Sequence, residues 1–426
     1  MTDKSLPSWW TLDNAAKIFP STASSHDSKV FRFACELQEP VDPALLQTAL
    51  DRTIERFPIY RCVMKRGWFW YYLEDSALPA RVRPEELPPC YPLYPAARRG
   101  LLFRVLYYRR RISLEVHHSL TDGAGALNFL CSLVYEYLLL RWPDRFPEPH
   151  PDLPYDASQF QRQADSFQKY YEKPPRRALS RSPAAYQLRG ERLPKNRLTI
   201  LEGRIPLDSL LACARARGAT LTELMAAVLL RAIHSGMRVR DRKRPVVITI
   251  PVNLRNYFPS ESARNFFATI NVGYDFSRGE DSLEAVLAQV RRGFQENLTE
   301  ERMRAQMNSL CALEHSIPLR LVPLPVKDVV LRAANWLAAR SVTASFSNVG
   351  RVSMPGEMGA LIRRFSVFTS AGMLQACACS FGGEYVVSFA SPFRSLEVER
   401  VFFRELAGMG LEIVLTTNLA PEKEEE

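Results

Sequence analysis

The sequence lacks the short motifs that identify several large enzyme classes. It contains no Gly-x-Ser-x-Gly, the turn that carries the nucleophile of α/β-hydrolases. It also contains no Gly-x-x-x-x-Gly-Lys-Ser/Thr, the loop that holds phosphates in P-loop proteins. A nucleophile-elbow hydrolase and a P-loop nucleotidase are therefore disfavoured.

Cysteines are present, but no two have the spacing of a zinc site. None of the eight forms a Cys-x-x-Cys pair, and most lie in apolar stretches. Cys377 and Cys379 would share one face of a strand, because side chains alternate along it. This usage predicts buried free thiols in a reducing cytosol and no disulfide framework.

The sequence shows no pattern typical of a targeting segment or a membrane span. The N-terminus has no apolar core behind a basic start, so we expect no secretory signal peptide. The longest uncharged run, residues 365–383, contains polar residues and is divided by Gly372. We predict two buried strands there, no membrane span, and a cytoplasmic location for the protein.

A dense basic tract is absent as well. The net charge is +10, from 56 Lys and Arg against 46 Asp and Glu, but the basic residues are scattered in small patches such as 109–111 and 238–244. Scattered arginines disfavour nucleic acid as a partner and favour a small molecule that carries phosphates.

The composition is that of a globular protein with more than one core. The chain has 426 residues, 46% of them hydrophobic and 24% charged, and domains of roughly 100–200 residues suggest two or three. Residues 142–200 are rich in proline and charge, which indicates a linker or surface excursion. We place a boundary within this stretch and predict subdomains at 1–175 and 176–426.

Periodic apolar residues predict helices and strands in both subdomains. Residues 30–38 are typical of a strand with Phe31 and Phe33 on one face, and residues 43–57 of a helix that Asp42 caps. Residues 62–64 and the aromatic-rich residues 68–73 are predicted as two strands joined by a turn at Gly67. The aromatic side chains of the second strand could equally belong to the core or line a substrate pocket.

The second half begins in the same order as the first. A strand is predicted at 198–205 and a helix from residue 207, followed by a helix at 221–235 behind a capping box of Thr220 and Glu223. The repeated order predicts an α/β (α+β) architecture built from two similar halves. Further helices are predicted at 282–298, 301–314, 326–340 and 396–411.

Residues 117–123, which read His-His-Ser-Leu-Thr-Asp-Gly, are the strongest candidate for a functional site. They follow a predicted strand and precede a predicted helix at 124–141. An imidazole accepts a proton near neutral pH, since its ordinary pKa is about 6.5, and Asp122 could orient it. Adjacent side chains of a strand point to opposite faces, so His117 and His118 cannot both face one pocket.

Other interpretations of this segment are possible on the residues alone. A metal site at His118 and Asp122 would need a helix that the glycines within 123–125 oppose, and no third ligand is nearby. A dinucleotide-binding turn would also use 123–125, but Asn128 occupies the third glycine position. Both histidines could also be ordinary core or surface side chains.

Residues 117–123 resemble the HHxxxDG signature of the CoA-dependent acyltransferase superfamily. This superfamily includes chloramphenicol acetyltransferase, the condensation domains of nonribosomal peptide synthetases, plant acyltransferases and bacterial alcohol acetyltransferases. Segments 42–58, 251–255 and 347–350 resemble the bacterial alcohol-acetyltransferase-like branch, so the likeness covers nearly the whole chain. The Asp-Phe-Gly-Trp-Gly motif of the plant branch is absent, which disfavours that branch.

The resemblance implies a fold and a set of roles. The fold would be two chloramphenicol-acetyltransferase-like subdomains, each a mixed sheet flanked by helices, with an active-site tunnel between them. His118 would be the general base and His117 would be turned away from the substrate. Asp122, beside Gly123 in the same loop, would be structural and pair with an arginine, for which Arg255 is our candidate.

An oxyanion donor is also required for acyl transfer. Ser347 or Asn348 is the candidate source, the alternative being that segment 347–350 is a simple turn.

The resulting hypothesis is an acyltransferase that moves an acyl group, in the first instance acetyl, from acyl-CoA to an alcohol or amine. Acyl-CoA would be a cosubstrate, with no tightly bound cofactor or metal, and the acceptor would be a small molecule. One alternative is a condensation-type enzyme whose donor thioester is carried by an acyl or peptidyl carrier protein. Another is an inactive binding homologue, against which the intact His118 and Asp122 argue.

Overall fold

The computed structural model of the chain describes residues 9–94, 100–148, 150, 166–172, 183–260, 262, 264–315, 320–370 and 372–419. Its strands are β1 (Trp9–Thr11), β2 (Val30–Leu37), β3 (Cys62–Arg66), β4 (Tyr71–Asp75), β5 (Val82–Pro84), β6 (Phe103–Tyr108), β7 (Arg111–His117), β8 (Thr199–Pro206), β9 (Val246–Asn253), β10 (Phe267–Tyr274), β11 (Ala344–Arg351), β12 (Ile362–Thr369), β13 (Gln375–Phe381), β14 (Glu384–Ser391) and β15 (Val414–Thr417). Its α-helices are α1 (Phe19–Thr22), α2 (Pro43–Arg56), α3 (Gly123–Arg141), α5 (Ser166–Lys169), α6 (Leu207–Ala216), α7 (Leu221–Ser235), α8 (Leu283–Asn297), α9 (Glu300–His315), α11 (Leu324–Ala339) and α12 (Glu397–Gly408).

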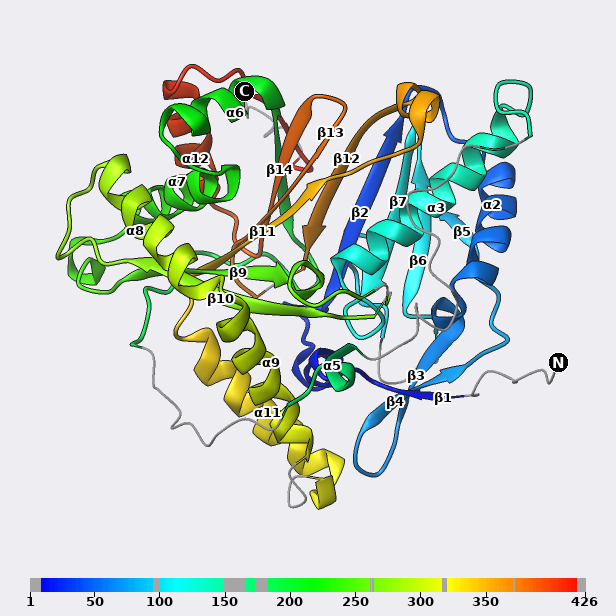
Figure 1. Cartoon of the computed structure of the whole chain (residues 1–426), viewed down its shortest axis with the longest axis horizontal. Helices are drawn as coiled ribbons and strands as arrows, with labels where there is room; N and C mark the ends of the chain where they lie inside the picture. The colour runs from blue at the N-terminus through cyan, green and yellow to red at the C-terminus, as the bar shows by residue number, and fades with distance from the viewer. Residues whose placement is uncertain are drawn as a thin grey trace, which may run out of the picture.

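The first half is a five-stranded sheet in the order β12-β2-β7-β6-β5. Phe31, Phe33 and Cys35 of β2 lie on one face, as the alternating pattern predicts, and belong to the core of this half; Arg32 and Ala34 on the opposite face are buried as well. Helices α2 and α3 pack against each other, and α3 contacts β2 and β7 (Figure 1). The cap predicted at Asp42 is confirmed, since its carboxylate accepts from the amides of Ala44 and Leu45.

The second half is a seven-stranded mixed sheet in the order β10-β9-β11-β13-β14-β8-β15. Helices α6, α7, α8 and α12 pack on it and on one another at the side away from the first half (Figure 1). The predicted capping box of Thr220 and Glu223 is present at the start of α7. The mixed α/β fold class and its division into two sheet-and-helix halves are therefore confirmed.

Strand β12 joins the two halves. It comes from the C-terminal part of the chain but pairs antiparallel with β2, Phe365 lying opposite Cys35. It also packs against β13 and β14 of the second sheet. Arg364 of this strand reaches Glu36 at 3.4 Å and Glu384 at 3.9 Å, one carboxylate from each half. The boundary proposed at 175/176 lies outside the described residues.

The predicted strand at 68–73 is wrong at its beginning. Arg66 at the end of β3 pairs with Tyr71 at the start of β4, so the residues between them form the hairpin turn. Trp68 in that turn is 87% exposed. Aromatic composition predicted a strand, but the register of the hairpin places these aromatic side chains at its tip.

Helix α3 is long and apolar enough to cross a membrane by length and composition alone. However, 67% of its apolar window is buried within the protein. Phe129, Leu130 and Leu133 are fully buried and belong to the core of the first half. A core helix that is hydrophobic on most sides accounts for this composition. The uncharged run at 365–383 forms most of β12 and β13, as predicted.

All eight cysteines are free, and seven of them are buried. Burial raises the pKa of Cys35, Cys90 and Cys379, so these thiols stay protonated at neutral pH. In the part of the chain that the structure describes, no three His, Cys, Asp or Glu side chains gather as a metal site.

Gly203 of β8 offers a direct test of the second core. A β-carbon at this position would overlap the ring of Phe403, which is buried on α12. We expect Gly203→Ala to lower the free energy of unfolding by about 1–3 kcal/mol, because overpacking forces the ring or helix to shift. Gly408→Ala is the matched control, since a β-carbon there has open space and alanine favours a helix. Urea denaturation measures both, and equal midpoints would contradict this packing.

Candidate active site

The loop at 117–123 is positioned by the strand before it and the helix after it. His117 is the last residue of β7 and pairs with Val30 of β2. The Asp122 side chain accepts from the amide of Gly125 at 3.0 Å and so caps α3. The strand end and the capped helix start fix both ends of the loop, and His118 lies just after the strand.

The ring of His118 packs between two aromatic side chains. Its centroid lies 4.4 Å from that of Phe31 and 5.0 Å from that of Phe19, on which it stacks. Its amide donates to the carbonyl of Lys29 at 2.8 Å, and its carbonyl accepts from the side chain of Asn265 at 2.9 Å. The side chain is partly exposed, and no described residue hydrogen-bonds either ring nitrogen.

This environment keeps His118 neutral. Burial, followed by the nearby positive charge of Lys29, lowers the pKa of His118 to about 3. The ring therefore carries a free lone pair throughout the physiological range. It is a base held in its uncharged form and has no partner among the described residues.

His117 is oriented differently from His118. Its Nδ1 accepts from the amide of Ser119 at 3.2 Å, and its ring meets Tyr94 edge-on at 6.4 Å. It is 1% exposed, and burial lowers its pKa to about 3. His117 is therefore enclosed and bonded to the loop backbone, whereas the side chain of His118 is partly exposed.

Asp122 and Arg255 lie in direct contact although they come from different halves. Their ion pair measures 2.7 Å, and the same Asp122 oxygen accepts from the amide of Phe266 at 2.8 Å. Arg255 lies in the short 3-10 helix after β9 and also donates to the carbonyls of Ser262 and Arg264, both at 2.7 Å. The loop is thus fastened to the second half by a buried and fully bonded charge pair.

Asn265 contacts the loop at 117–123 and was not predicted from the sequence. Its side-chain amide donates to the carbonyl of His118 and to Asp13 at 3.1 Å. Asp13 also accepts from the Asn265 backbone amide at 3.2 Å. Through these bonds Asn265, in the second half, contacts both the N-terminal segment that contains Asp13 and the loop that contains His118. Neither residue belongs to a periodic pattern, so the sequence carries no signal for the pairing.

Ser347 and Asn348 lie in strand β11, so the alternative of a simple turn is wrong. The strand pairs in parallel with β13 and has an irregularity between Asn348 and Gly350. The Asn348 amide donates to the hydroxyl of Thr222 at 2.9 Å, at the start of α7. Neither residue hydrogen-bonds His118 in the described structure, so their role at an oxyanion stays a prediction.

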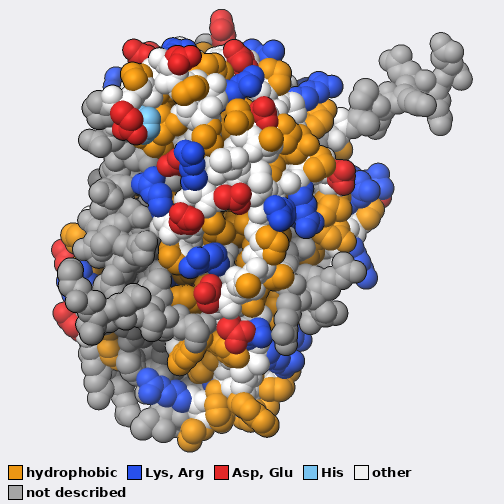
Figure 2. Space-filling model, turned by 90° about the vertical axis from the view of Figure 1, so that its right-hand side faces the viewer, with side chains coloured by type: hydrophobic (Ala, Val, Ile, Leu, Met, Phe, Trp, Pro, Cys, Tyr) orange, Lys and Arg blue, Asp and Glu red, His pale blue; other side chains and the backbone are white. Residues whose placement is uncertain are grey.

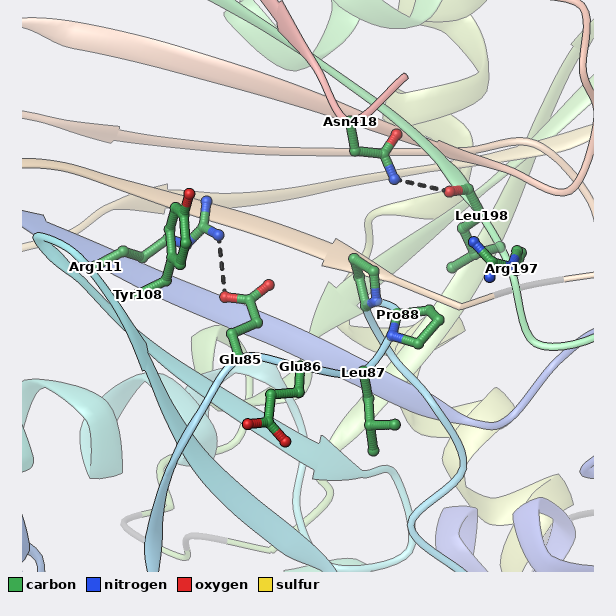
Figure 3. Close-up of a pocket in the computed structure, with 10 residues that line it drawn as sticks. Glu85, Glu86, Leu87, Pro88, Tyr108, Arg111, Arg197, Leu198 and Asn418 are labelled. Atoms are coloured by element: carbon green, nitrogen blue, oxygen red, sulfur yellow. Dashed lines mark hydrogen bonds and ion pairs between the residues drawn. The ribbon is translucent and has the colours of Figure 1, made fainter. Parts of the chain in front are cut away.

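A cavity of about 460 Å³ lies between the two sheets, lined by Arg32 and Phe368 from the first and Glu202 from the second. An adjoining pocket of about 410 Å³, drawn in Figure 3, shares Glu85 and Arg111 with it. Neither is lined by the histidine loop. Figure 3 shows Arg111 turned to Glu85, at 3.0 Å.

The arginines of this cavity are paired with carboxylates. Arg32 lies 2.6 Å from Glu115 and also contacts Glu85, and Arg104 contacts Glu115. Together with Arg111, these arginines share the two carboxylates Glu85 and Glu115.

The lowered pKa of His118 predicts an unusual pH profile. The base form is present above about pH 3, whereas a histidine of ordinary pKa would be half protonated at about 6.5. We expect kcat/KM to stay level from neutral pH down to about pH 5. Initial rates in buffers of constant ionic strength measure this, with circular dichroism recorded at each pH. Loss of half the activity near pH 6.5 without unfolding would contradict it.

The lowered pKa values of His117 and His118 make the folded state less stable as the pH falls, whereas a histidine in a salt bridge makes it more stable. In the unfolded chain both histidines take up protons below about pH 6.5, whereas in the folded chain they stay neutral to about pH 3. Their contribution to stability is therefore complete above about pH 6.5 and is lost as the pH falls toward 3.

No model of a known protein family matches the sequence, and no curated protein matches it. Solved structures do match over almost the whole chain. Polyketide synthase associated protein 5 from Mycobacterium tuberculosis superposes with a TM-score of 0.60 at 14% identity, over 94% of this chain and 98% of that one. The first condensation domain of the CDA synthetase superposes with a TM-score of 0.60 at 16% identity, over 96% and 97%.

A structure solved with coenzyme A gives a similar result. F. graminearum TRI101, in complex with coenzyme A and T-2 mycotoxin, superposes with a TM-score of 0.63 at 10% identity, over 95% of this chain and 99% of that one. At these identities the comparison establishes the fold and not the activity. The chain therefore shares the fold of these solved structures, which include a condensation domain.

Proposed function

We propose that this protein is an acyltransferase in which His118 is the general base for direct transfer between a thioester and an acceptor hydroxyl or amine. The observation that carries the proposal is the state of the His118 ring. It is neutral, partly exposed and free of hydrogen-bond partners among the described residues. It is also held by Asn265 and Lys29 where the two halves meet.

The reaction needs only one proton carrier. A ring nitrogen of His118 takes the proton from the acceptor O–H or N–H as the acceptor heteroatom bonds to the thioester carbonyl carbon. The tetrahedral intermediate then collapses, the C–S bond breaks, and the imidazolium returns the proton to the leaving thiolate. The acyl group passes directly to the acceptor, without an acyl-enzyme.

The low pKa of His118 constrains how this proton moves. A free imidazolium between Phe19 and Phe31, near Lys29, is unfavourable. Proton uptake is therefore coupled to the appearance of negative charge on the thioester oxygen, which stabilises the imidazolium beside it. Ser347 or Asn348 is the proposed donor to that oxygen, once substrate has bound.

Asp122 and Arg255 act on His118 through the loop. Asp122 accepts from Arg255, Phe266 and Gly125, so its carboxylate has no oxygen directed at the imidazole. We assign both as positioning residues. They hold the loop to α3 and to the second half, and thereby set where His118 meets the substrate.

Acyl-CoA is the proposed donor and a small alcohol or amine the proposed acceptor. The F. graminearum TRI101 structure contains coenzyme A together with T-2 mycotoxin, in a chain of the same fold. The similarity to a condensation domain supports a second candidate, in which a carrier protein bears the thioester.

The experiment compares both donors with one readout. Release of free thiol is followed with acetyl-CoA, with longer acyl-CoAs and with an acylated carrier protein, each against a panel of alcohols and amines and with products identified by mass. We expect acceptor-dependent thiol release with an acyl-CoA. Release with the acylated carrier alone would select the second candidate. No transfer with any donor would overturn the proposal.

A further inference from the structure

Near its start, helix α11 buries two charged residues and exposes several apolar ones. Lys327 and Asp328 are 6% and 4% exposed, whereas Val329 and Val330 are 63% and 56% exposed. A surface helix of a globular protein normally shows the reverse arrangement. Two turns further on, Trp336 and Leu337 are also exposed, in a part of the helix where all of residues 332–338 are exposed.

The buried charges are well bonded to the first half. Asp328 accepts from Ser21 at 2.6 Å and from Tyr71 at 3.2 Å, and lies 3.5 Å from Arg66. The Lys327 ammonium donates to the carbonyl of Phe69 at 3.0 Å and lies 3.8 Å from the centre of the Trp70 ring. These contacts fix the rotation of α11.

The exposed apolar side chains of α11 continue onto the β3–β4 hairpin. The amide of Leu324 donates to the carbonyl of Trp68 at 2.9 Å, which ties the hairpin tip to the start of the helix. We define the apolar patch as the exposed hydrophobic residues of these two segments and of Leu321, three residues before the helix: Trp68, Phe69, Leu321, Val326, Val329, Val330, Trp336 and Leu337. In Figure 1 the hairpin and α11 extend to the same lower end of the molecule, and hydrophobic side chains gather at that end in Figure 2.

Positive charge surrounds this patch. Arg340 stacks on the ring of Trp336 at 3.6 Å and is itself exposed, as is Arg332. Arg66 at the hairpin is 55% exposed, and its ion pair with Asp328 offsets part of its charge. The one acidic residue of α11 is Asp328, which is buried. The charge pattern therefore matches an anionic partner, and it disfavours a second copy of this chain, whose patch would carry the same positive charge.

We propose that the apolar patch binds the surface of an anionic lipid bilayer. A helix that presents valine, leucine and tryptophan, flanked by arginines and without exposed acids, has the composition of an interfacial helix that lies in the plane of the membrane. Tryptophan suits the headgroup level and arginine suits anionic headgroups. The protein would lie on the membrane and not span it.

The position of α11 places this surface close to the candidate active site. Helix α1 lies between them: its Phe19 stacks on His118, and its Ser21 hydrogen-bonds Asp328. A bilayer on the patch would therefore be separated from the imidazole of His118 by α11 and the short helix α1. The binding itself does not depend on the proposed acyl transfer, because it is measured without substrate.

Vesicle co-sedimentation of the full-length protein tests the proposal. We expect binding to vesicles of phosphatidylcholine mixed with phosphatidylglycerol, and weaker binding to phosphatidylcholine alone or at high salt. The double variant Val329→Ser, Val330→Ser should bind about tenfold more weakly, since the exposed valines no longer enter the interface. Val239→Ser, an exposed valine of the second half, is the matched control and should bind as the wild type does.

The charge contribution has its own variant. Arg340→Gln should weaken binding to the anionic vesicles and leave the weak binding to neutral vesicles unchanged. Circular dichroism and the thermal midpoint confirm that each variant is folded. Absence of binding to anionic vesicles, or equal loss in Val239→Ser, would overturn the proposal. So would a dimer in sedimentation equilibrium that the double variant dissociates, because the patch would then be covered by a second copy.

Discussion

Replacing His118 with alanine is expected to lower kcat/KM by about 10²–10⁴-fold, the range that a general base contributes. The ring nitrogens have no hydrogen-bond partner among the described residues, so no loop contact is lost when they are removed. The backbone contacts of residue 118 with Lys29 and Asn265 do not need the imidazole. The loss should therefore appear in catalysis while the fold is retained.

A matched control separates catalysis from stability. His26 is exposed, and its ring contacts the hydroxyl of Ser25 and no described residue of the loop, so His26→Ala should retain full activity. Initial rates of thiol release are measured for the wild type and both variants, with thermal midpoints for each. Wild-type turnover in His118→Ala would rule out the assignment of the base, whatever the behaviour of the control.

Replacing Asp122 with alanine should destabilise the protein by about 3–5 kcal/mol, the cost of leaving one member of a buried ion pair without its partner. Arg255, 14% exposed, would lose its carboxylate, and the Phe266 amide and the start of α3 would lose an acceptor. Urea denaturation of the wild type and the variant measures the change.

Two comparisons make this result specific. Arg400→Ala removes an exposed ion pair with Glu397 at 3.4 Å and should cost at most about 1 kcal/mol. Asp122→Ala combined with Arg255→Met removes both charges and should recover part of the stability, because no unpaired charge remains buried. Equal losses in Asp122→Ala and Arg400→Ala would show that the pair does not fasten the halves.

Local signals in the sequence predicted local structure well. The cap at Asp42 and the capping box of Thr220 and Glu223 each depend on residues only two or three positions apart, and both form as predicted. Alternation in β2 correctly indicated which of its side chains share one face in the core of the first half. The contact between Asp122 and Arg255, 133 positions apart, was proposed from the family resemblance and not from spacing, and the structure places the two side chains together.

Other contacts between distant segments could not be predicted from the residues of those segments. Nothing in residues 362–369 shows that β12 leaves its own half to pair with β2. Asn265 could be found only by knowing which loops meet at His118. For α11, periodicity predicts a helix but assumes that its apolar side faces inward. The bonds of Lys327 and Asp328 to the hairpin and to α1 turn that side outward.

The central claim is that His118 removes the proton of the acceptor during direct acyl transfer. The most direct measurement is the ratio of kcat/KM for the wild type to that for His118→Ala, taken across a series of acceptors whose hydroxyl groups become progressively more acidic. A general base matters less as the acceptor loses its proton more readily, so the ratio should fall steadily along the series. A ratio that stays constant across the series would contradict the claim, because His118 would then only shape the site.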